Sequence, residues 1–294
     1  MEKITVSICC QTFNHKDYIA QALDSFLIQK TTFKYEILLR DDASTDGTSV
    51  ICKRYAKEFP ELIKLLAYKE NQYQKGVRPL ADNLKRAKGK YIAICEGDDY
   101  WTDPLKLQKQ VDFLEANADC SVCFHPSKFI YQNNPANFKI HKPKAANGNS
   151  FFTMKDVILG GGSFMTTNSM VFRNNLITQN LRWVQDAPAG DLPLMLQLAL
   201  KGSIGYIDEV MGVYRVVSPG SWSSTMLKST KQNRKHYRLM MTMWTEFDNW
   251  TNKKYHYYVL LKKFKNSFYY NLKFIKYFVR NIKKLSKVKM SLFI

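Results

Sequence analysis

The stretch that decides the fold of this chain reads Tyr91-Ile92-Ala93-Ile94-Cys95-Glu96-Gly97-Asp98-Asp99-Tyr100-Trp101. An apolar run of strand character ends there in three carboxylates within four residues. Carboxylates so close together repel one another unless a cation neutralises them, and their hard oxygen ligands suit Mg²⁺ or Mn²⁺. The stretch therefore predicts a strand that leads into a divalent-cation site able to grip a diphosphate. The alternative is a solvated acidic turn before a helix start at Thr102-Asp103-Pro104.

Strand and helix patterns alternate around this stretch up to about residue 125. The apolar runs of strand length are Lys3–Gln11, Tyr35–Leu39, Leu62–Ala67 and Lys90–Cys95. Stripes with helical spacing lie between them at His15–Gln29, Thr48–Phe59 and Leu80–Ala87. This alternation predicts an α/β fold with a Rossmann-like, mostly parallel sheet flanked by helices. Such sheets bind ligands at the carboxyl ends of their strands, where both acidic clusters, Asp41-Asp42 and Glu96–Asp99, fall.

The rest of the chain has weaker patterns. Pro126–Ser150 is polar and rich in Asn and Lys, so we expect a loop or irregular excursion. Thr166–Phe172 predicts a strand, Gly190–Leu200 a helix, and Tyr206–Val217 one or two short strands. From Thr225 onward the pattern is helical and rich in Met, Tyr, Phe and Lys.

The charge of the chain is concentrated at its C-terminal end. Of the formal net charge of +19, residues 253–294 supply twelve Lys or Arg and no Asp or Glu, which leaves +7 for the rest. Aromatic and aliphatic residues alternate with these lysines, which predicts a basic amphipathic helix on an anionic membrane surface. The alternative is a helix that packs its aromatic face on the protein with its lysines in water. No nucleic-acid motif accompanies the charge, so we expect no nucleic-acid partner.

Cysteine usage and the absence of targeting segments indicate the compartment. The six cysteines have no regular framework, and Cys9 and Cys10 are adjacent within a predicted strand, so a reduced, cytosolic-type environment is expected. The CxxC pair Cys120 and Cys123 has no second Cys or His pair, which argues against zinc or redox chemistry. With no signal peptide and no apolar run of ~20 residues, the protein is expected to be soluble or peripheral.

The motifs together resemble the family 2 glycosyltransferases of the GT-A fold. The stretches that carry the resemblance are Val6–Asn14, Ile37–Thr48, Ala87–Ile92 and Glu96-Gly97-Asp98-Asp99. The resemblance implies a catalytic domain over residues 1–222, with a nucleotide-sugar-binding half at 1–103 and an acceptor-binding half at 104–222. The helical, basic and aromatic C-terminal extension then occupies residues 223–294.

The resemblance also implies roles for residues of the nucleotide-binding half. Thr12 and Asn14 would line the nucleotide pocket. Asp42 would accept a hydrogen bond from the base, normally uracil, and Asp41 would support that loop. The alternative for both aspartates is capping of the following helix, although Asp46 lies nearer to its start.

The acidic cluster and one later aspartate would carry the chemistry. Asp98 would coordinate Mn²⁺ or Mg²⁺ on the diphosphate, with Asp99 joining the metal shell or supporting the loop. Glu96 stands where the family usually has its first Asp and would contact the ribose or the metal. Asp191 matches the catalytic base that takes the proton from the acceptor hydroxyl, which implies inversion at the anomeric carbon. The alternative for Asp191 is a helix N-cap.

Two departures from the family pattern affect the site. The family often has Tyr-Arg-x-His before a Gly/Trp/Ser-rich loop, and here Val217 stands at the His position. The metal shell is therefore expected to be thinner, with Arg215 or Ser221 carrying more of the diphosphate contact. Where the family has an Arg-Asn pair the chain has Leu80-Ala81, and the nearby candidates are Arg78 and Asn83. The segments expected to shape the acceptor pocket are Gly161-Gly162-Ser163 and Thr167–Ser169.

The sequence thus predicts an inverting enzyme that moves a hexosyl or N-acetylhexosaminyl group from a UDP-sugar to a hydroxyl of a glycan or lipid-linked acceptor. The setting expected from the resemblance is bacterial surface polysaccharide synthesis, in the cytoplasm at the inner face of the membrane. The alternatives are a nucleotidyltransferase-like enzyme and a non-catalytic scaffold on the membrane surface.

Overall fold

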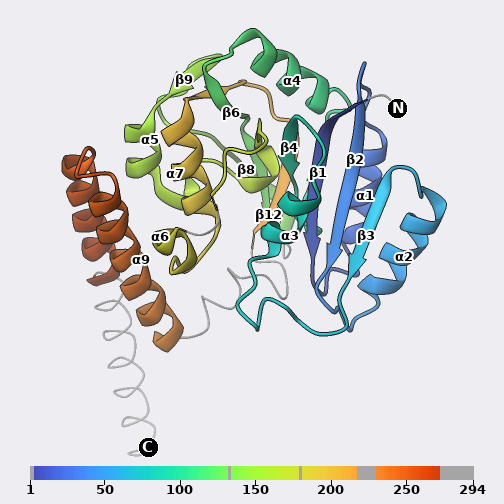
Figure 1. Cartoon of the computed structure of the whole chain (residues 1–294), viewed down its shortest axis with the longest axis horizontal. Helices are drawn as coiled ribbons and strands as arrows, with labels where there is room; N and C mark the ends of the chain where they lie inside the picture. The colour runs from blue at the N-terminus through green and yellow to red at the C-terminus, as the bar shows by residue number, and fades with distance from the viewer. Residues whose placement is uncertain (1–2, 132–133, 179–180, 217–229, 272–294) are drawn as a thin grey trace, which may run out of the picture.

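An eight-stranded sheet forms the centre of the protein, whose computed structural model describes residues 3–131, 134–178, 181–216 and 230–271 (Figure 1). Its strands are β1 (Ile4–Thr12), β2 (Lys34–Asp41), β3 (Ile63–Ala67), β4 (Tyr91–Ile94), β6 (Cys120–Phe124), β9 (Ser150–Phe152), β10 (Val171–Arg173) and β11 (Ser203–Tyr206). They lie in the order β3-β2-β1-β4-β10-β6-β11-β9. The first four pair in parallel, as do β6 and β11, whereas β9 and β10 run antiparallel to their neighbours. The predicted α/β fold with a mostly parallel sheet is confirmed.

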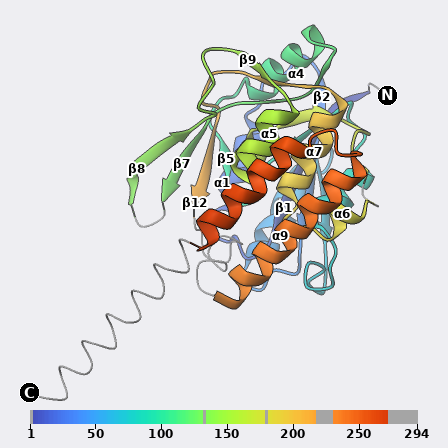
Figure 2. The ribbon, with the colours of Figure 1, turned by 90° about the vertical axis from the view of Figure 1, so that its left-hand side faces the viewer.

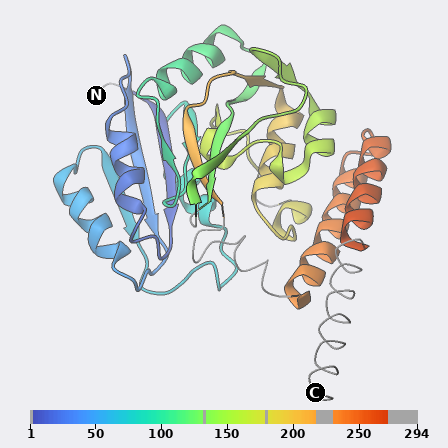
Figure 3. The same ribbon diagram turned by 180° about the vertical axis from the view of Figure 1, so that it is seen from behind.

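Helices cover both faces of this sheet (Figures 1 and 3). They are α1 (Ile19–Leu27), α2 (Thr48–Glu58), α3 (Pro79–Arg86), α4 (Lys106–Ala116), α5 (Met154–Gly160), α6 (Arg182–Gln185) and α7 (Asp191–Lys201). Alternate side chains of β1 enter two different cores, because Ile8 packs with Phe26 of α1 and Cys9 packs in the cluster that contains Leu196 of α7. Burial of β1 on both faces explains its continuous apolar sequence.

A smaller four-stranded sheet stands beside the main one (Figure 2). Its strands are β5 (Tyr100–Trp101), β7 (Ser127–Tyr131), β8 (Asn134–His141) and β12 (Gly212–Val216), in the order β5-β12-β7-β8. The prediction of a loop or irregular excursion over Pro126–Ser150 is wrong, because β7 and β8 pair there as antiparallel strands. The segment lacks an obvious strand pattern because β8 is an edge strand, on which even Phe138 and Ile140 remain exposed.

A short 3₁₀ turn, η2 (Thr167–Ser169), connects the two sheets. The strand predicted over Thr166–Phe172 is therefore wrong in its first half, and only its end belongs to β10. The Asn168 side-chain amide donates to the Val213 carbonyl (2.9 Å), and the Trp101 indole donates to the Asn168 carbonyl (2.8 Å). These buried bonds satisfy polar groups that a strand ladder would otherwise pair.

Two helices form a pair at the edge of the molecule, α9 (Thr230–Trp250) and a helix over residues 256–271 (Figures 1 and 2). Trp244 of the first and Val259 of the second are buried in the same apolar cluster as the main sheet. The predicted helical extension is confirmed over these residues, and its remainder, 272–294, lies outside the described part of the chain. Among the described helices, none combines the length and the apolar character needed to cross a bilayer.

Candidate active site

The acidic loop, Glu96–Asp99, crosses the carboxyl end of β1. The Gly97 amide donates to the Gln11 carbonyl oxygen (2.9 Å), so the loop lies directly on the strand end. A Cβ atom on Gly97 would lie 2.7 Å from Thr12 Oγ1, and only glycine allows this approach. Thr12 is itself buried, and its hydroxyl has no hydrogen-bond partner among the described residues. The fold therefore brings Thr12 and the three loop carboxylates together, as the sequence predicted for the carboxyl edge of the sheet.

Arg215 on β12 holds the acidic loop from the other side. Its backbone amide donates to Asp99 Oδ1 (2.8 Å), and its guanidinium donates to the Asp98 carbonyl oxygen. The guanidinium carbon also lies 4.7 Å from the ring centroid of Tyr18 and 4.7 Å from that of Tyr100. An arginine between two rings and bound to the loop backbone is fixed in position. The geometry makes Arg215 a clamp on the loop, and its contact with a diphosphate stays a prediction.

The two aspartates of the loop have different surroundings. Asp99 is 1% exposed, and its Oδ2 is buried with no hydrogen-bond partner among the described residues. Burial, followed by the charges of Asp98 and Glu96, raises the pKa of Asp99 well above its usual value. The Asp98 side chain is 14% exposed, and its Oδ2 lies 3.8 Å from His15 Nε2. Of the two predicted metal ligands, Asp98 therefore reaches the solvent side and Asp99 faces the protein.

Glu96 and Asp191 interact across the site. Thr167 Oγ1 on η2 donates to Glu96 Oε2 (2.7 Å). Burial raises the pKa of Glu96 to about 8, and the negative charge of Asp191 is the next largest cause. Desolvation by the surrounding protein also raises the pKa of Asp191, while the positive charge of Arg78 lowers it. With a pKa of about 8, Glu96 is mainly protonated at neutral pH when no metal is bound.

Asp191 is the first residue of α7, at the side of the site that belongs to the second half of the chain. The N-cap of this helix is Gly190, and no side chain makes a capping hydrogen bond, so the capping alternative does not describe Asp191. A carboxylate in the first turn is nevertheless favoured by the helix dipole. The residue is exposed to solvent, so a second substrate has access to its carboxyl.

The loop after β2 is tied to the end of β1. Asn14, at a φ of 55°, donates its backbone amide to Ser44 Oγ (2.9 Å), and its Oδ1 accepts from the Thr45 amide (2.9 Å). Asp41 accepts from Ser44 Oγ (2.5 Å) and from the hydroxyl of Ser49. This geometry is the one that the predicted loop-supporting role of Asp41 requires, whereas the start of α2 is bound by Asp46 through the Thr48 amide (2.9 Å).

Asp42 organises a second loop. Its two oxygens accept from the backbone amides of Gln72 (2.9 Å) and Tyr73 (3.1 Å), and Arg40 Nη2 lies 3.2 Å from Oδ1. Asp42 is 3% exposed, so these contacts hold the residue 72–73 turn against the sheet edge. Contact between Asp42 and a nucleotide base stays a prediction.

The two candidates near the family's missing Arg-Asn pair differ in position. Arg78 Nη2 donates to the carbonyl oxygens of Val184 (3.2 Å) and Gln185 (2.9 Å), which connects the loop before α3 to α6. Asn83 is fully buried, and its side-chain amide donates to the carbonyls of Leu38 (2.8 Å) and Cys10. Arg78 is therefore part of the site wall beside Asp191, and Asn83 supports the sheet from below.

Three rings, which we call the aromatic row, lie on one face of the smaller sheet. Tyr214 and Phe129 have ring centroids 4.9 Å apart, and Phe129 stacks on His141 at 4.6 Å. Burial raises the pKa of Tyr214, and the negative charges of the site carboxyls raise it further. This end of the row is therefore next to the acidic loop. His141 Nε2 lies 2.6 Å from the carbonyl of Ser163, within the segment expected to shape the acceptor pocket. Sequence reasoning missed Phe129 and His141 because the pairing of β7, β8 and β12 brings them together.

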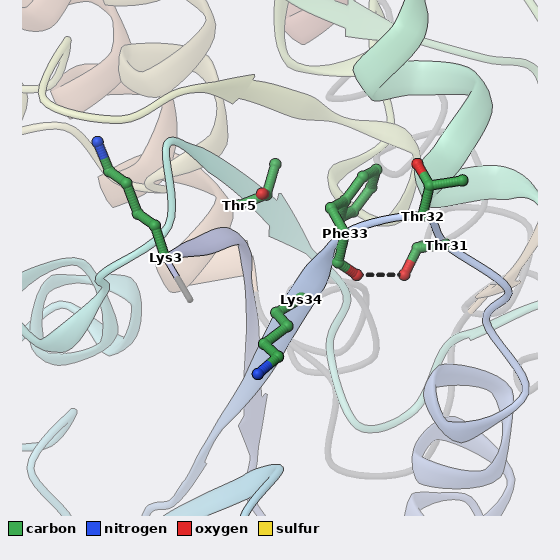
Figure 4. A pocket seen from close by; sticks show the side chains of 6 residues that line it. All are labelled: Lys3, Thr5, Thr31, Thr32, Phe33 and Lys34. Carbon is green, nitrogen blue, oxygen red and sulfur yellow. Dashed lines mark hydrogen bonds between the residues drawn. The ribbon is translucent and has the colours of Figure 1, made fainter. Parts of the chain in front are cut away.

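A shallow hollow at the other end of the sheet is separate from this site (Figure 4). Its lining residues are Lys3, Thr5, Thr31, Thr32, Phe33 and Lys34. They surround the first residues of β1 and β2, whereas Thr12 and Asp41 are the last residues of those strands. The carboxyl cluster therefore defines the functional edge.

The described residues contain no group of three or more His, Cys, Asp or Glu arranged to hold a metal ion. Mg²⁺ in nucleotide sites is commonly bound by one or two carboxylates and by the phosphates of the substrate. Asp98 fits that mode, since its partly exposed side chain reaches the solvent side of the acidic loop. Val217 and Ser221, which the sequence placed near the metal, lie outside the described residues.

A mostly parallel sheet that gathers carboxylates at the carboxyl ends of its strands defines an α/β protein with a ligand site at this edge. Residues 7–179 match the model of glycosyl transferase family 2, and the chain belongs to this family. An uncharacterized protein of Mycobacterium tuberculosis is 37% identical over 224 residues, which cover 74% of this chain and 61% of that protein. The putative teichuronic acid biosynthesis glycosyltransferase TuaG of Bacillus subtilis is 31% identical over 238 residues, covering 80% of this chain and 88% of TuaG.

Solved structures show the same architecture. A crystal structure of Staphylococcus aureus TarS residues 1–349 in complex with UDP-GlcNAc has a TM-score of 0.62 at 20% identity. The likeness covers 84% of this chain and 67% of that chain. The GT-A type fold is thereby confirmed.

Proposed function

We propose that the protein is an inverting glycosyltransferase that transfers a hexosyl or N-acetylhexosaminyl group from a UDP-sugar to an acceptor hydroxyl. The observation that carries the proposal is the meeting of the acidic loop with Asp191 at one edge of the sheet. One side of this edge can hold a charged diphosphate, and the other presents a solvent-accessible carboxyl. A single displacement requires these two functions on opposite sides of the anomeric carbon.

The nucleotide would bind over the ends of β1 and β2. The two loops that Asp41 and Asp42 hold in place frame this position, and Thr12 and Asn14 lie at its floor. Because backbone hydrogen bonds fix both loops, little ordering remains to be done when the nucleotide binds. The complex of TarS with UDP-GlcNAc supports a UDP-sugar as the donor.

Asp98 would hold Mn²⁺ or Mg²⁺, and the bound ion would neutralise the departing diphosphate. Arg215 keeps the acidic loop in position for this role by binding the loop backbone. Glu96, neutral at pH 7, would offer its proton as a hydrogen-bond donor to the ribose or the donor sugar. The neutrality of Glu96 also reduces the repulsion among the carboxyl groups of the site.

Asp191 would accept the proton of the attacking hydroxyl. Its raised pKa makes it a better base than an ordinary aspartate, while Arg78 favours its ionised form. The aromatic row offers a flat, half-buried surface next to this carboxyl, suited to the apolar face of an acceptor sugar.

We place the reaction in bacterial surface polysaccharide synthesis, with a glycan or lipid-linked acceptor. The teichuronic acid role in the name of TuaG supports this setting. The basic residues at 253–294 support binding of the enzyme to an anionic membrane surface on the cytoplasmic face. A lipid-linked acceptor would be within reach there.

Donor turnover tests the proposal. Release of UDP from a panel of UDP-sugars is measured with Mn²⁺, and the configuration of the transferred sugar is read by NMR. We expect UDP release from one donor, its loss in Asp98→Ala, and an inverted product. Release without inversion would contradict the role of Asp191, and no release from any nucleotide sugar would favour a non-catalytic scaffold. Cleavage of a nucleoside triphosphate instead would favour the nucleotidyltransferase alternative.

A further inference from the structure

The helix over residues 256–271 turns apolar side chains toward water. Phe264 is 73% exposed, Tyr257 is 67% exposed and Phe268 is 55% exposed. These side chains share one side of the helix, because their spacing follows its turns. We call this side the apolar face; its members are Tyr257, Leu260, Leu261, Phe264 and Phe268. A surface helix of a soluble protein normally shows the opposite arrangement, with polar residues outward.

The opposite side of the helix is bound to the protein, so the apolar face cannot turn inward. Val259 is 1% exposed and belongs to the main core. Lys262 Nζ donates to the Leu159 carbonyl (3.1 Å), and the ring of Tyr270 stacks on Tyr237 of α9 at 4.1 Å. Burial lowers the pKa of Lys262 to about 8, which agrees with its inward position. The orientation of the apolar face is therefore set by the fold.

The charged side chains of this helix and of the residues just before it are all positive. Residues 253–271 contain five lysines and no acidic residue. Two of these lysines, Lys253 and Lys254, are exposed at the start of the helix, and Lys265 is exposed within the apolar face. A second copy of the chain would bring the same positive charges together, whereas an anionic surface complements them. Rings and leucines between lysines are typical of helices that lie in the interface of a bilayer.

We propose that the apolar face docks the protein on an anionic lipid bilayer, with its rings and leucines in the interfacial region and the lysines at lipid phosphates. The proposal rests on the membrane setting of the proposed function and assigns it to named residues. Because the helix is fixed to the main core, docking would also fix the orientation of the active site relative to the bilayer.

Vesicle sedimentation of the full chain tests the proposal. The protein is mixed with vesicles of phosphatidylcholine alone, or of equal parts phosphatidylcholine and phosphatidylglycerol. We expect binding to the second kind only, and a loss of about tenfold or more in Phe264→Ser/Phe268→Ser, since two exposed rings leave the interface. The matched control is Phe138→Ser/Phe151→Ser, which removes two exposed rings on the sheets and should leave binding unchanged.

Three results would overturn the proposal. Equal binding by the Phe264/Phe268 variant and the wild type would show that the apolar face does not dock. Binding that does not depend on phosphatidylglycerol would remove the role of the lysines. A wild-type dimer in light scattering that becomes monomeric in the variant would assign the face to a second copy. UDP release without vesicles is measured in parallel, so that failure of docking and failure of the proposed transferase reaction are told apart.

Discussion

The donor side and the acceptor side of the site are built in different ways. On the donor side, carboxylates follow shortly after β2 and β4, and backbone amides of the residue 72–73 turn and of β12 hold Asp42 and Asp99. On the acceptor side, rings from three strands of the smaller sheet meet beside Asp191. Bound diphosphate and metal carry concentrated charge and need fixed polar groups, whereas a sugar ring needs shape and apolar contact. Variants on the two sides should therefore affect different kinetic constants.

The largest expected effect is that of Asp191→Asn, which keeps the shape of the side chain and removes the base. We predict a loss of about 10²- to 10⁴-fold in kcat, as is typical for removal of a general base. Donor binding and the melting temperature should change little, since Asp191 makes no capping bond. UDP release with acceptor present measures kcat, and thermal shift measures donor binding and the melting temperature. A variant that keeps more than half of the wild-type kcat would rule out Asp191 as the base.

Arg215→Lys should weaken the donor side without touching the acceptor side. Lysine cannot bind the Asp98 carbonyl and lie between Tyr18 and Tyr100 in the way that a planar guanidinium does. We predict a rise of about tenfold in the Kd for UDP with Mn²⁺, the equivalent of one lost charged hydrogen bond. Titration calorimetry checks this value. Arg182→Lys, at a side chain that is 84% exposed, is the control and should bind UDP as the wild type does.

His141→Ala should weaken acceptor binding and leave donor binding unchanged, the reverse of Arg215→Lys. It removes one end of the aromatic row and leaves every donor-side contact intact. We predict a rise of roughly three- to tenfold in the KM for acceptor, the value of one ring contact, with the Kd for UDP unchanged. Steady-state kinetics with varied acceptor measure it. An equal loss in UDP binding would show that the two sides are not separate.

The smallest effect concerns pH. The pKa of Glu96 is raised to about 8, so the folded state holds this proton more tightly than the unfolded chain. Stability is therefore expected to fall as pH rises from the unfolded pKa near 4.5 toward 8. Glu96→Gln, which is neutral at every pH, should flatten this decline in chemical denaturation curves recorded without metal. Identical pH profiles of the two proteins would contradict the assignment.

A second buried group acts in the reverse direction and must be separated from the first. Lys106 is fully buried, donates to Gln110 Oε1 (2.6 Å), and has its pKa lowered to about 7 by burial. Its contribution destabilises the folded state most at pH values below 7 and fades as pH rises toward the unfolded value of 10.5. Lys106→Met should therefore raise the melting temperature at pH 6 more than at pH 9. A uniform rise at both pH values would show that Lys106 is not the titrating group.

The sequence predicted the donor side better than the acceptor side for a physical reason. Strands β1, β2 and β4 are buried on both faces and are separated by regular helices, so their apolar runs can be recognised in the local sequence. Asp42 and Asp98 come shortly after β2 and β4. The β7–β8 hairpin is partly exposed, and its polar sequence hides the strands. Phe129 and His141 become neighbours only through the pairing of β7, β8 and β12, which cannot be recognised in the local sequence. The clamp geometry of Arg215 depends on the same pairing.

The most direct test of the account is a thermal shift experiment with UDP, with and without Mn²⁺, on the wild type and on Asp98→Ala. We predict a rise in melting temperature with UDP that is much larger when Mn²⁺ is present, and no metal-dependent rise in Asp98→Ala. The same rise in the variant, or no response of the wild type to any nucleoside diphosphate with metal, would contradict the claim that the acidic loop binds the donor.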